Sequence, residues 1–186
     1  MEAMEAADVR DDLVHVLYTA DQIEARLREI GAEIDRDYAG RELLLVGVLN
    51  GAVMVMSDLA RAMRSHMQMD WMAVSSYGAA TKSSGIVRIL KDLNCDIKGR
   101  DVLVVEDIID TGLTLNFLMD NLKAREPASI EIMAAFRKPD ALRVDVPVRY
   151  IGFDIPNEFV VGYGLDYAQR YRNLRDVGTL DPRVYS

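Results

Sequence analysis

The sequence predicts an α/β fold, in which helices flank a mostly parallel, doubly wound sheet. Two observations support this prediction. Short apolar segments rich in β-branched residues recur along the chain, which is typical of buried strands. Between several of them lie segments with apolar residues three or four positions apart, which is typical of amphipathic helices. Strands that alternate with helices favour a parallel, doubly wound sheet.

The first half of the chain contains two predicted helices and two predicted strands. In the segment 19–40, apolar residues follow one another at spacings of four, three and four, and Thr19 and Gln22 match a capping box at its start. The segment 43–49, "LLLVGVL", predicts a buried strand, and 51–65 has helical spacing. A further strand is predicted at 69–77.

The second half continues the alternation. Strands are predicted at 86–90, 101–106, 129–136, 148–153 and 159–164, with a helix at 114–124 between the second and third of these. The segment 78–85, "GAATKSSG", is small, polar and rich in Gly and Ser, so we expect a mobile loop there.

Length and charge limit the possible functions. A chain of 186 residues, half of them apolar, is long enough for one buried core, so we expect a single domain over 1–186. Its net charge of −8 repels a nucleic-acid backbone, and we expect no nucleic-acid partner. An anionic ligand would therefore have to be held by local groups.

The cysteine content and hydropathy indicate a cellular location. The lone Cys95 excludes an internal disulfide framework and a cysteine-based zinc cluster. No apolar stretch reaches membrane-spanning length, and the acidic first residues do not resemble a signal or transit peptide. We expect a soluble cytoplasmic protein that does not bind membranes.

The segment 102–114, "VLVVEDIIDTGLT", places three carboxylates at the end of a predicted strand and before a predicted helix. Three kinds of chemistry use such a cluster: half of an aspartic-protease site, a metal site, or a loop that binds a phosphorylated sugar. A protease needs two carboxylates that share a proton, and this chain has one Asp-Thr-Gly, so a dimer would have to supply the second. A metal cage needs further ligands, but His15 and His66 are far away in the sequence.

A sugar-phosphate site accounts for the whole segment. Backbone N–H groups at the start of the helix, with the hydroxyls of Thr111 and Thr114, suit a phosphate, and Gly112 allows close approach. Glu106 and Asp107 are about one strand rise apart, roughly 3.3 Å, which suits two ribose hydroxyls or a magnesium ion. Helix capping is the alternative, but it would explain Asp110 alone.

The same segment resembles the phosphoribosyl pyrophosphate motif of type I phosphoribosyltransferases, in the form found in their 6-oxopurine branch. "GVLNGA" resembles the family's pyrophosphate loop, "SSYG" its mobile loop, and "IGFDIPNEFVVGYGLDYAQRYRNL" its purine-binding segment. These blocks follow in family order from about 16 to 180, and the central segment is similar to that of the bacterial hypoxanthine phosphoribosyltransferases. The resemblance implies a small hood built from about 8–20 and 137–180.

The resemblance also implies a purine-salvage reaction. Hypoxanthine or guanine reacts with phosphoribosyl pyrophosphate to give IMP or GMP and pyrophosphate, with inversion at the anomeric carbon. Mg²⁺ is the implied cofactor, and a homodimer or homotetramer is the implied assembly. Rival hypotheses are a nucleic-acid-binding regulator on the same fold and a transferase for xanthine or a pyrimidine.

Site residues follow by matching the family motifs. Asp110 corresponds to the general base or acid near purine N7, Lys138 to the donor to the 6-oxo group, and Phe159 to the ring that stacks on the purine. The backbone of Val160 corresponds to the reader of the Watson–Crick edge. The implied ligands of phosphoribosyl pyrophosphate are Glu106, Asp107, Asp110, Thr111, Gly112, Leu113, Thr114, Asn50, Gly51 and Arg172, and the implied metal ligands are Asp166, Glu106 and Asp107.

Two further features are implied for this chain. A lid over 76–86, with Ser76 and Tyr77, would close over the site and exclude water. The peptide between Leu49 and Asn50 corresponds to a non-proline cis peptide, and Asn50 stands where the family usually has lysine. Either a positive charge near the pyrophosphate or a contact between subunits is therefore missing here.

Overall fold

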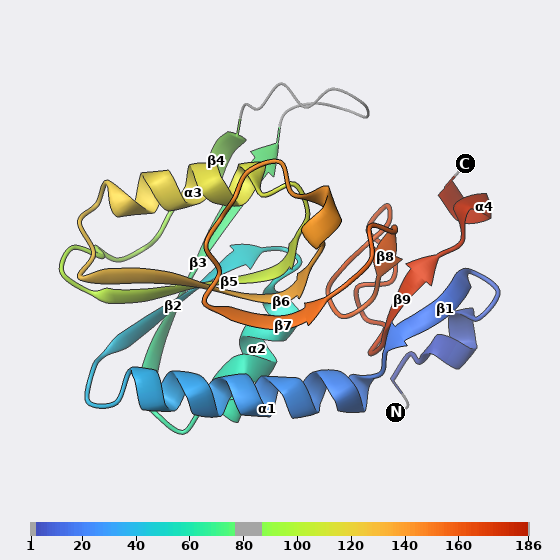
Figure 1. Ribbon diagram of the computed structural model, residues 1–186, viewed down its shortest axis with the longest axis horizontal. Coiled ribbons are helices and arrows are strands. Elements are labelled where there is room, and N and C mark those ends of the chain that lie inside the picture. Colours follow the sequence, from blue (N-terminus) through green and yellow to red (C-terminus); the bar gives the residue numbers. More distant parts are fainter. Residues whose placement is uncertain (1–2, 77–86, 186) are drawn as a thin grey trace.

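A six-stranded sheet in the order β4-β3-β2-β5-β6-β7 runs through the main body of the protein (Figure 1). The computed structural model describes residues 3–76 and 87–185. Neighbouring strands are parallel except for β3 and β4, which pair antiparallel at one edge. The strands are β2 (Leu43–Leu49), β3 (Met67–Ser76), β4 (Val87–Lys91), β5 (Asp101–Ile109), β6 (Ser129–Arg137) and β7 (Tyr150–Asp154).

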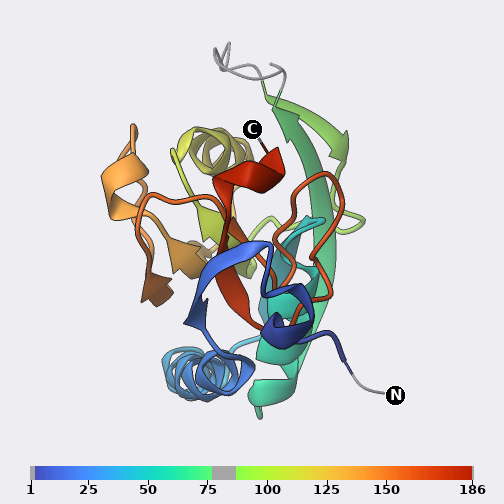
Figure 2. The same ribbon diagram turned by 90° about the vertical axis from the view of Figure 1, so that its right-hand side faces the viewer.

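Helices cover both faces of this sheet, as predicted (Figures 1 and 2). α1 (Ala20–Asp37) and α2 (Val53–Ala62) lie on one face and α3 (Leu113–Lys123) on the other. Successive residues of a strand point to opposite faces, so Leu103 packs toward α1 and α2 while Val104 packs toward α3. The central residues of these strands are therefore continuous apolar runs, 43–48 in β2 and 102–105 in β5, and all of them are buried.

A second, antiparallel sheet in the order β1-β9-β8 forms the hood. It joins β1 (Leu13–Tyr18) to β8 (Val160–Val161) and β9 (Val177–Leu180), so the two ends of the chain meet there. Figure 1 shows the hood beyond the carboxyl ends of β2 and β7. Short helical turns at Ala6–Val9 and Pro182–Tyr185 (α4) flank it, and another, Pro139–Ala141, follows β6. β7 lies within the range predicted for the hood but belongs to the main sheet.

Element boundaries differ from the prediction where tertiary contacts decide them. The capping box is present, with the Thr19 hydroxyl accepting from the Gln22 N–H. β5 continues past the predicted residue 106 to Ile109, because Ile108 and Ile109 pair with β6. The strand predicted at 159–164 shrinks to two residues, because the backbone takes positive φ values from Gly162 to Gly164.

The predicted lid over 76–86 lies outside the described residues, apart from Ser76, which ends β3. Tyr77 belongs to the same undescribed segment. In the described ranges, no helix combines the length and apolar character needed to cross a membrane.

Candidate active site

A pocket of about 320 Å³ lies at the carboxyl ends of β2 and β5 and the start of α3. Its position agrees with the rule that open α/β sheets bind ligands beyond the carboxyl ends of their strands. Three segments far apart in the sequence meet in it: the loop after β2, the end of β5, and the hood. The lining residues are 48–51, 106–112, 114, 115, 166 and 172.

The start of α3 forms one end of the pocket. Gly112 is the N-cap residue, with a φ of +79°, and no side chain caps the helix. A Cβ on Gly112 would lie 2.9 Å from the Val144 carbonyl oxygen, so the loop after β6 covers the far side of this turn. The Leu113 N–H reaches the Thr111 hydroxyl at a long 3.5 Å. An uncapped helix start with hydroxyls beside it suits an anionic group such as phosphate.

Glu106 and Asp107, which precede this turn on β5, line the same pocket. Burial, and then the charge of Asp107, raise the pKa of Glu106 well above its ordinary value. Burial raises the pKa of Asp107 to about 6, although a hydrogen bond from the Ile108 N–H and the positive charge of Arg172 oppose the rise. Burial outweighs any compensating groups at both carboxyls, so the pair suits a ligand that supplies hydroxyls or positive charge.

The loop after β2 packs directly against these acids. The Leu49–Asn50 peptide is cis, as the family resemblance implies. A Cβ on Gly51 would lie 1.6 Å from Asp107 Oδ2, so only glycine fits there. On its other side, a Cβ on Gly164 of the hood would lie 2.2 Å from the Gly51 carbonyl oxygen. Backbone from the loop and the hood is thus packed tightly around Asp107.

Asp166 and Arg172 bring opposite charges into the pocket from the hood. Arg172 Nη2 lies 2.8 Å from Asp166 Oδ1, and its Nη1 donates to the Gly164 carbonyl at 2.7 Å. Asp166 Oδ2 accepts from the Gln169 N–H at 2.8 Å. Both charges act on Asp107, because Arg172 lowers its pKa and Asp166 raises it.

Within the described part of the chain, no three His, Cys, Asp or Glu side chains are placed to hold a metal ion by themselves. Mg²⁺ commonly takes only one or two protein carboxylates and completes its shell with water and substrate phosphates. One or two of Asp166, Glu106 and Asp107 therefore suffice for a magnesium ion that arrives with a phosphorylated substrate, whereas the three do not form a permanent metal centre.

Asp110 lines the pocket and forms a polar pair with Lys138, which is not among the lining residues. Lys138 is buried, its backbone N–H donates to the Ile109 carbonyl, and its Nζ lies 3.5 Å from Asp110 Oδ2. About half of the Asp110 side chain is exposed to solvent. A donor and a carboxylate this close together match the edge of a 6-oxopurine, where O6 and N7 are neighbours.

Phe159 and Val160 belong to the hood and do not line the pocket described above. Val160 is buried and pairs with Thr179 of β9. The Phe159 ring is 41% exposed and contacts Tyr167 edge-on at 5.9 Å and Tyr185 at 5.0 Å between ring centroids. An exposed aromatic held by two other rings is suited to stacking against a flat ligand.

The contact between Tyr185 and Phe159 is absent from the sequence prediction. Asp181 followed by Pro182 is a common start for a helix and indicates α4, which carries Tyr185. No local pattern places this tail against Phe159. The same holds for Val144, whose carbonyl covers Gly112 from a loop with no recognisable motif.

Comparisons with known proteins point to a single family. The sequence profile of the phosphoribosyl transferase domain matches residues 15–168. Hypoxanthine-guanine phosphoribosyltransferases of Mycobacterium tuberculosis and Streptococcus agalactiae are 57% and 48% identical to this chain, over 94% and 96% of it and 89% and 99% of their own length. The crystal structure of a hypoxanthine phosphoribosyltransferase from Staphylococcus aureus superposes with a TM-score of 0.93, at 45% identity, covering 96% of this chain and 97% of that one.

Proposed function

We propose that this chain, which belongs to the phosphoribosyltransferase family, binds its substrates in the pocket between β2, β5 and the hood. Its activity is that of a hypoxanthine-guanine phosphoribosyltransferase of purine salvage. The observation that carries the placement is the meeting of the α3 start, the β5 acids and the Asp166–Arg172 pair in one pocket. That pocket offers a site for each part of phosphoribosyl pyrophosphate.

Phosphoribosyl pyrophosphate extends along the pocket in this proposal. Its 5′-phosphate binds the backbone N–H groups and hydroxyls of 110–114, at the positive end of the α3 dipole. Glu106 and Asp107 accept hydrogen bonds from the ribose hydroxyls. The pyrophosphate lies against the backbone of Asn50 and Gly51 and accepts hydrogen bonds from Arg172.

Magnesium fits this arrangement as the cofactor. Asp166 and the β5 acids would hold it together with substrate oxygens, and when bound it neutralises the charge of the departing pyrophosphate. Arg172 adds a fixed positive charge on the same side. Asn50 brings no charge to this end, so Arg172 carries more of the protein's electrostatic contribution than it would beside a lysine.

The base binds between Lys138, Asp110 and Phe159. Lys138 donates to the 6-oxo oxygen, which favours hypoxanthine and guanine, since the amino group of adenine would leave a buried donor unpaired. Asp110 handles the N7 proton as the base attacks the anomeric carbon, and its Oδ2 lies 3.5 Å from the Lys138 ammonium. Phe159 stacks on the ring, and the backbone of Val160 contacts its Watson–Crick edge.

Several further properties belong to the proposal. We infer one domain over 1–186, a lid at 76–86, and a homodimer or homotetramer acting in the cytoplasm. The acidic net charge and the retention of Lys138 and Asp166 oppose the alternative of a nucleic-acid-binding regulator.

A transfer assay with four bases tests the proposal. Hypoxanthine, guanine, xanthine and adenine are each incubated with phosphoribosyl pyrophosphate and Mg²⁺, and turnover is followed spectrophotometrically. We expect turnover of the first two bases and a fall in kcat of about 10² to 10⁴ in Asp110→Asn, the range for loss of a general acid or base. Full activity of that variant would refute the role given to Asp110.

A further inference from the structure

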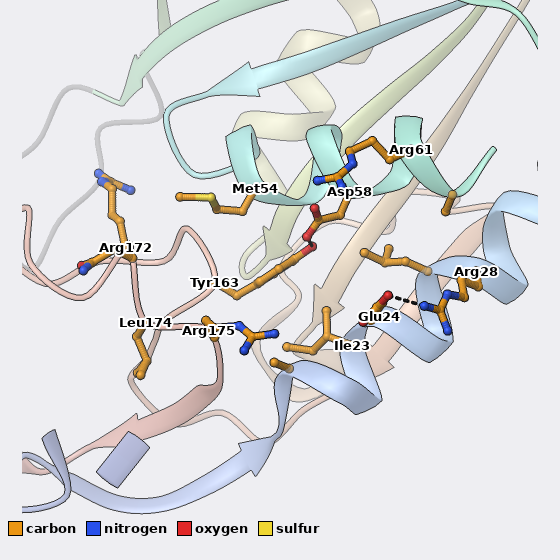
Figure 3. A pocket seen from close by; sticks show the side chains of 14 residues that line it. Ile23, Glu24, Arg28, Met54, Asp58, Arg61, Tyr163, Arg172, Leu174 and Arg175 are labelled. Carbon is orange, nitrogen blue, oxygen red and sulfur yellow. Dashed lines mark hydrogen bonds and ion pairs between the residues drawn. The ribbon is translucent and has the colours of Figure 1, made fainter. Parts of the chain in front are cut away.

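A tyrosine–aspartate hydrogen bond ties the hood to α2, close to the pyrophosphate end of the pocket. The Tyr163 hydroxyl donates to Asp58 Oδ2 at 2.7 Å. Figure 3 shows the Tyr163 side chain extending from the hood to Asp58, in the wall of a second hollow between α1, α2 and the hood. Arg172 borders both this hollow and the active-site pocket. The bond therefore lies beside the active site without being part of it.

The backbone around Tyr163 needs to be held in place by such a contact. Gly162, Tyr163 and Gly164 have φ values of +100°, +51° and +96°, and this left-handed region is unfavourable for tyrosine. The tyrosine side chain is 8% exposed, so it is packed as well as hydrogen-bonded. Burial, and then the Asp58 carboxylate, raise the pKa of Tyr163 far above its ordinary value, so the phenol keeps the proton that it donates.

The turn that Tyr163 anchors carries the charged groups of the pocket. The Tyr163 N–H donates to the Leu174 carbonyl at 2.8 Å, and the Gly164 N–H donates to the Arg172 carbonyl at 3.0 Å. The Arg172 guanidinium in turn donates to the Gly164 carbonyl and pairs with Asp166. If residue 163 moved, both Asp166 and Arg172 would therefore move with it, because all three lie in the same turn.

The other end of the bond lies on the helix that continues the pyrophosphate loop. α2 begins at Val53, directly after Gly51 and its neighbour Ala52, and Asp58 lies less than two helical turns further on. Gly164 packs on the Gly51 carbonyl with no room for a side chain. The hydrogen bond and this close packing together hold the hood turn 162–174 against the loop on which the pyrophosphate lies.

We propose that Asp58 is a positioning residue for the pyrophosphate end of the active site. Through Tyr163 it holds the turn that carries Arg172 against the loop that carries Gly51. This inference rests on the proposed placement of pyrophosphate beside Arg172. Phe159 and Val160 precede the turn, so the bond affects binding of pyrophosphate and phosphoribosyl pyrophosphate and leaves binding of the base unchanged.

The test compares Tyr163→Phe with a matched control, Tyr150→Phe. Tyr150 is also buried, and its hydroxyl donates to Asp37 Oδ2 at 2.6 Å, but this pair joins the end of α1 to the start of β7, away from the pocket. Both variants lose one partly buried tyrosine–aspartate hydrogen bond and keep the ring. A merely structural role predicts the same effect on unfolding temperature and on kinetics in the two variants.

We expect Tyr163→Phe to raise KM for pyrophosphate in the reverse reaction, and KM for phosphoribosyl pyrophosphate in the forward reaction, by about tenfold, the effect of one hydrogen bond to a charged group. KM for hypoxanthine and for IMP should change less than about twofold. Tyr150→Phe should lower the unfolding temperature to a similar extent with all KM values unchanged. An unchanged KM for pyrophosphate in Tyr163→Phe, or an equal rise in Tyr150→Phe, would overturn the inference.

Variants of Asp58 separate positioning from packing. Asp58→Asn keeps an oxygen acceptor and should stay near the wild-type KM, whereas Asp58→Ala should match Tyr163→Phe. Asp58→Ala combined with Tyr163→Phe should be no worse than either alone, because both remove the same bond; additive losses would contradict this. Arg172→Gln serves as the reference. If this variant does not raise KM for pyrophosphate, the proposed placement of pyrophosphate beside Arg172 is wrong. If Arg172→Gln raises KM for pyrophosphate but Tyr163→Phe does not, only the role of Asp58 is rejected.

Discussion

Replacing Asp107 by Asn is expected to stabilise the unliganded protein above pH 6 while impairing catalysis. Burial raises the pKa of this carboxyl from 3.8 to about 6. Below about pH 4 the group is protonated in both the folded and the unfolded chain, so it does not affect stability. Between about pH 4 and 6 the unfolded chain releases a proton that the folded chain retains, so the free energy of unfolding falls as the pH rises. Above about pH 6 the folded chain has released this proton as well, and the free energy of unfolding falls no further.

The size of this loss follows from the two pKa values. A difference of one pKa unit corresponds to about 1.36 kcal/mol, so a rise from 3.8 to about 6 gives an upper limit of about 3 kcal/mol. Solvent access to the partly exposed Asp107 side chain reduces it. In Asp107→Asn the new amide oxygen would still accept the bond that the Ile108 N–H donates to Asp107 Oδ1, so the substitution removes the charge without removing that contact.

Urea unfolding of wild type and Asp107→Asn at pH 4.5, 6 and 8, without ligands, measures the effect. We expect the variant to be more stable by about 1 to 3 kcal/mol at pH 8, a smaller advantage at pH 4.5, where only part of the loss has occurred, and a large loss of transfer activity. Mg²⁺ with phosphoribosyl pyrophosphate should stabilise wild type more than the variant. A variant that is less stable at pH 8, or a difference that does not depend on pH, would refute the reasoning.

Three further substitutions test individual parts of the site. Gly51→Ala would place a Cβ 1.6 Å from Asp107 Oδ2, so kcat/KM for phosphoribosyl pyrophosphate should fall at least about 100-fold. Gly40→Ala, at a φ of +75° but with no atom within 4 Å, should lower stability and leave the kinetics unchanged. Lys138→Gln should lower kcat/KM for hypoxanthine by about 10- to 100-fold and lower the ratio of kcat/KM for hypoxanthine to that for adenine. If this ratio is unchanged in competition assays, Lys138 does not contact the 6-oxo group. Phe159→Leu should raise KM for hypoxanthine by roughly five- to tenfold with KM for phosphoribosyl pyrophosphate unchanged, and equal changes in both constants would exclude a stacking role.

Features set by local sequence are the ones that were predicted correctly. The spacing of Ile23, Leu27, Ile30 and Ile34 places one apolar face on α1, and all four side chains are buried. The Thr19 capping box requires only a side chain and a backbone three residues apart. The turn into α3 is equally local, since Gly112 supplies the positive φ and caps the helix without a side chain. Periodicity and short-range hydrogen bonds determine such elements before any distant contact forms.

The positions at which the strands end depend on tertiary contacts that the sequence pattern does not show. The acids of β5 suggest that the strand ends at 106, yet pairing with β6 carries it to Ile109 and buries Glu106. The raised pKa values of Glu106 and Asp107 follow from that burial and so are not visible in the motif itself. In the same way, three consecutive positive φ values end β8 after Val161, which the apolar run 159–164 does not indicate.

The fold class, the turn into α3 and, through the ordered motifs, the family follow from the sequence, because each depends on patterns within short segments of the chain. The packing of Gly51, Asp107 and Gly164 against one another, and the hydrogen bond from Tyr163 to Asp58, arise only in the folded structure. These contacts join residues 50 to more than 100 positions apart, and their geometry is set by close packing of the loop, the sheet and the hood rather than by local preference.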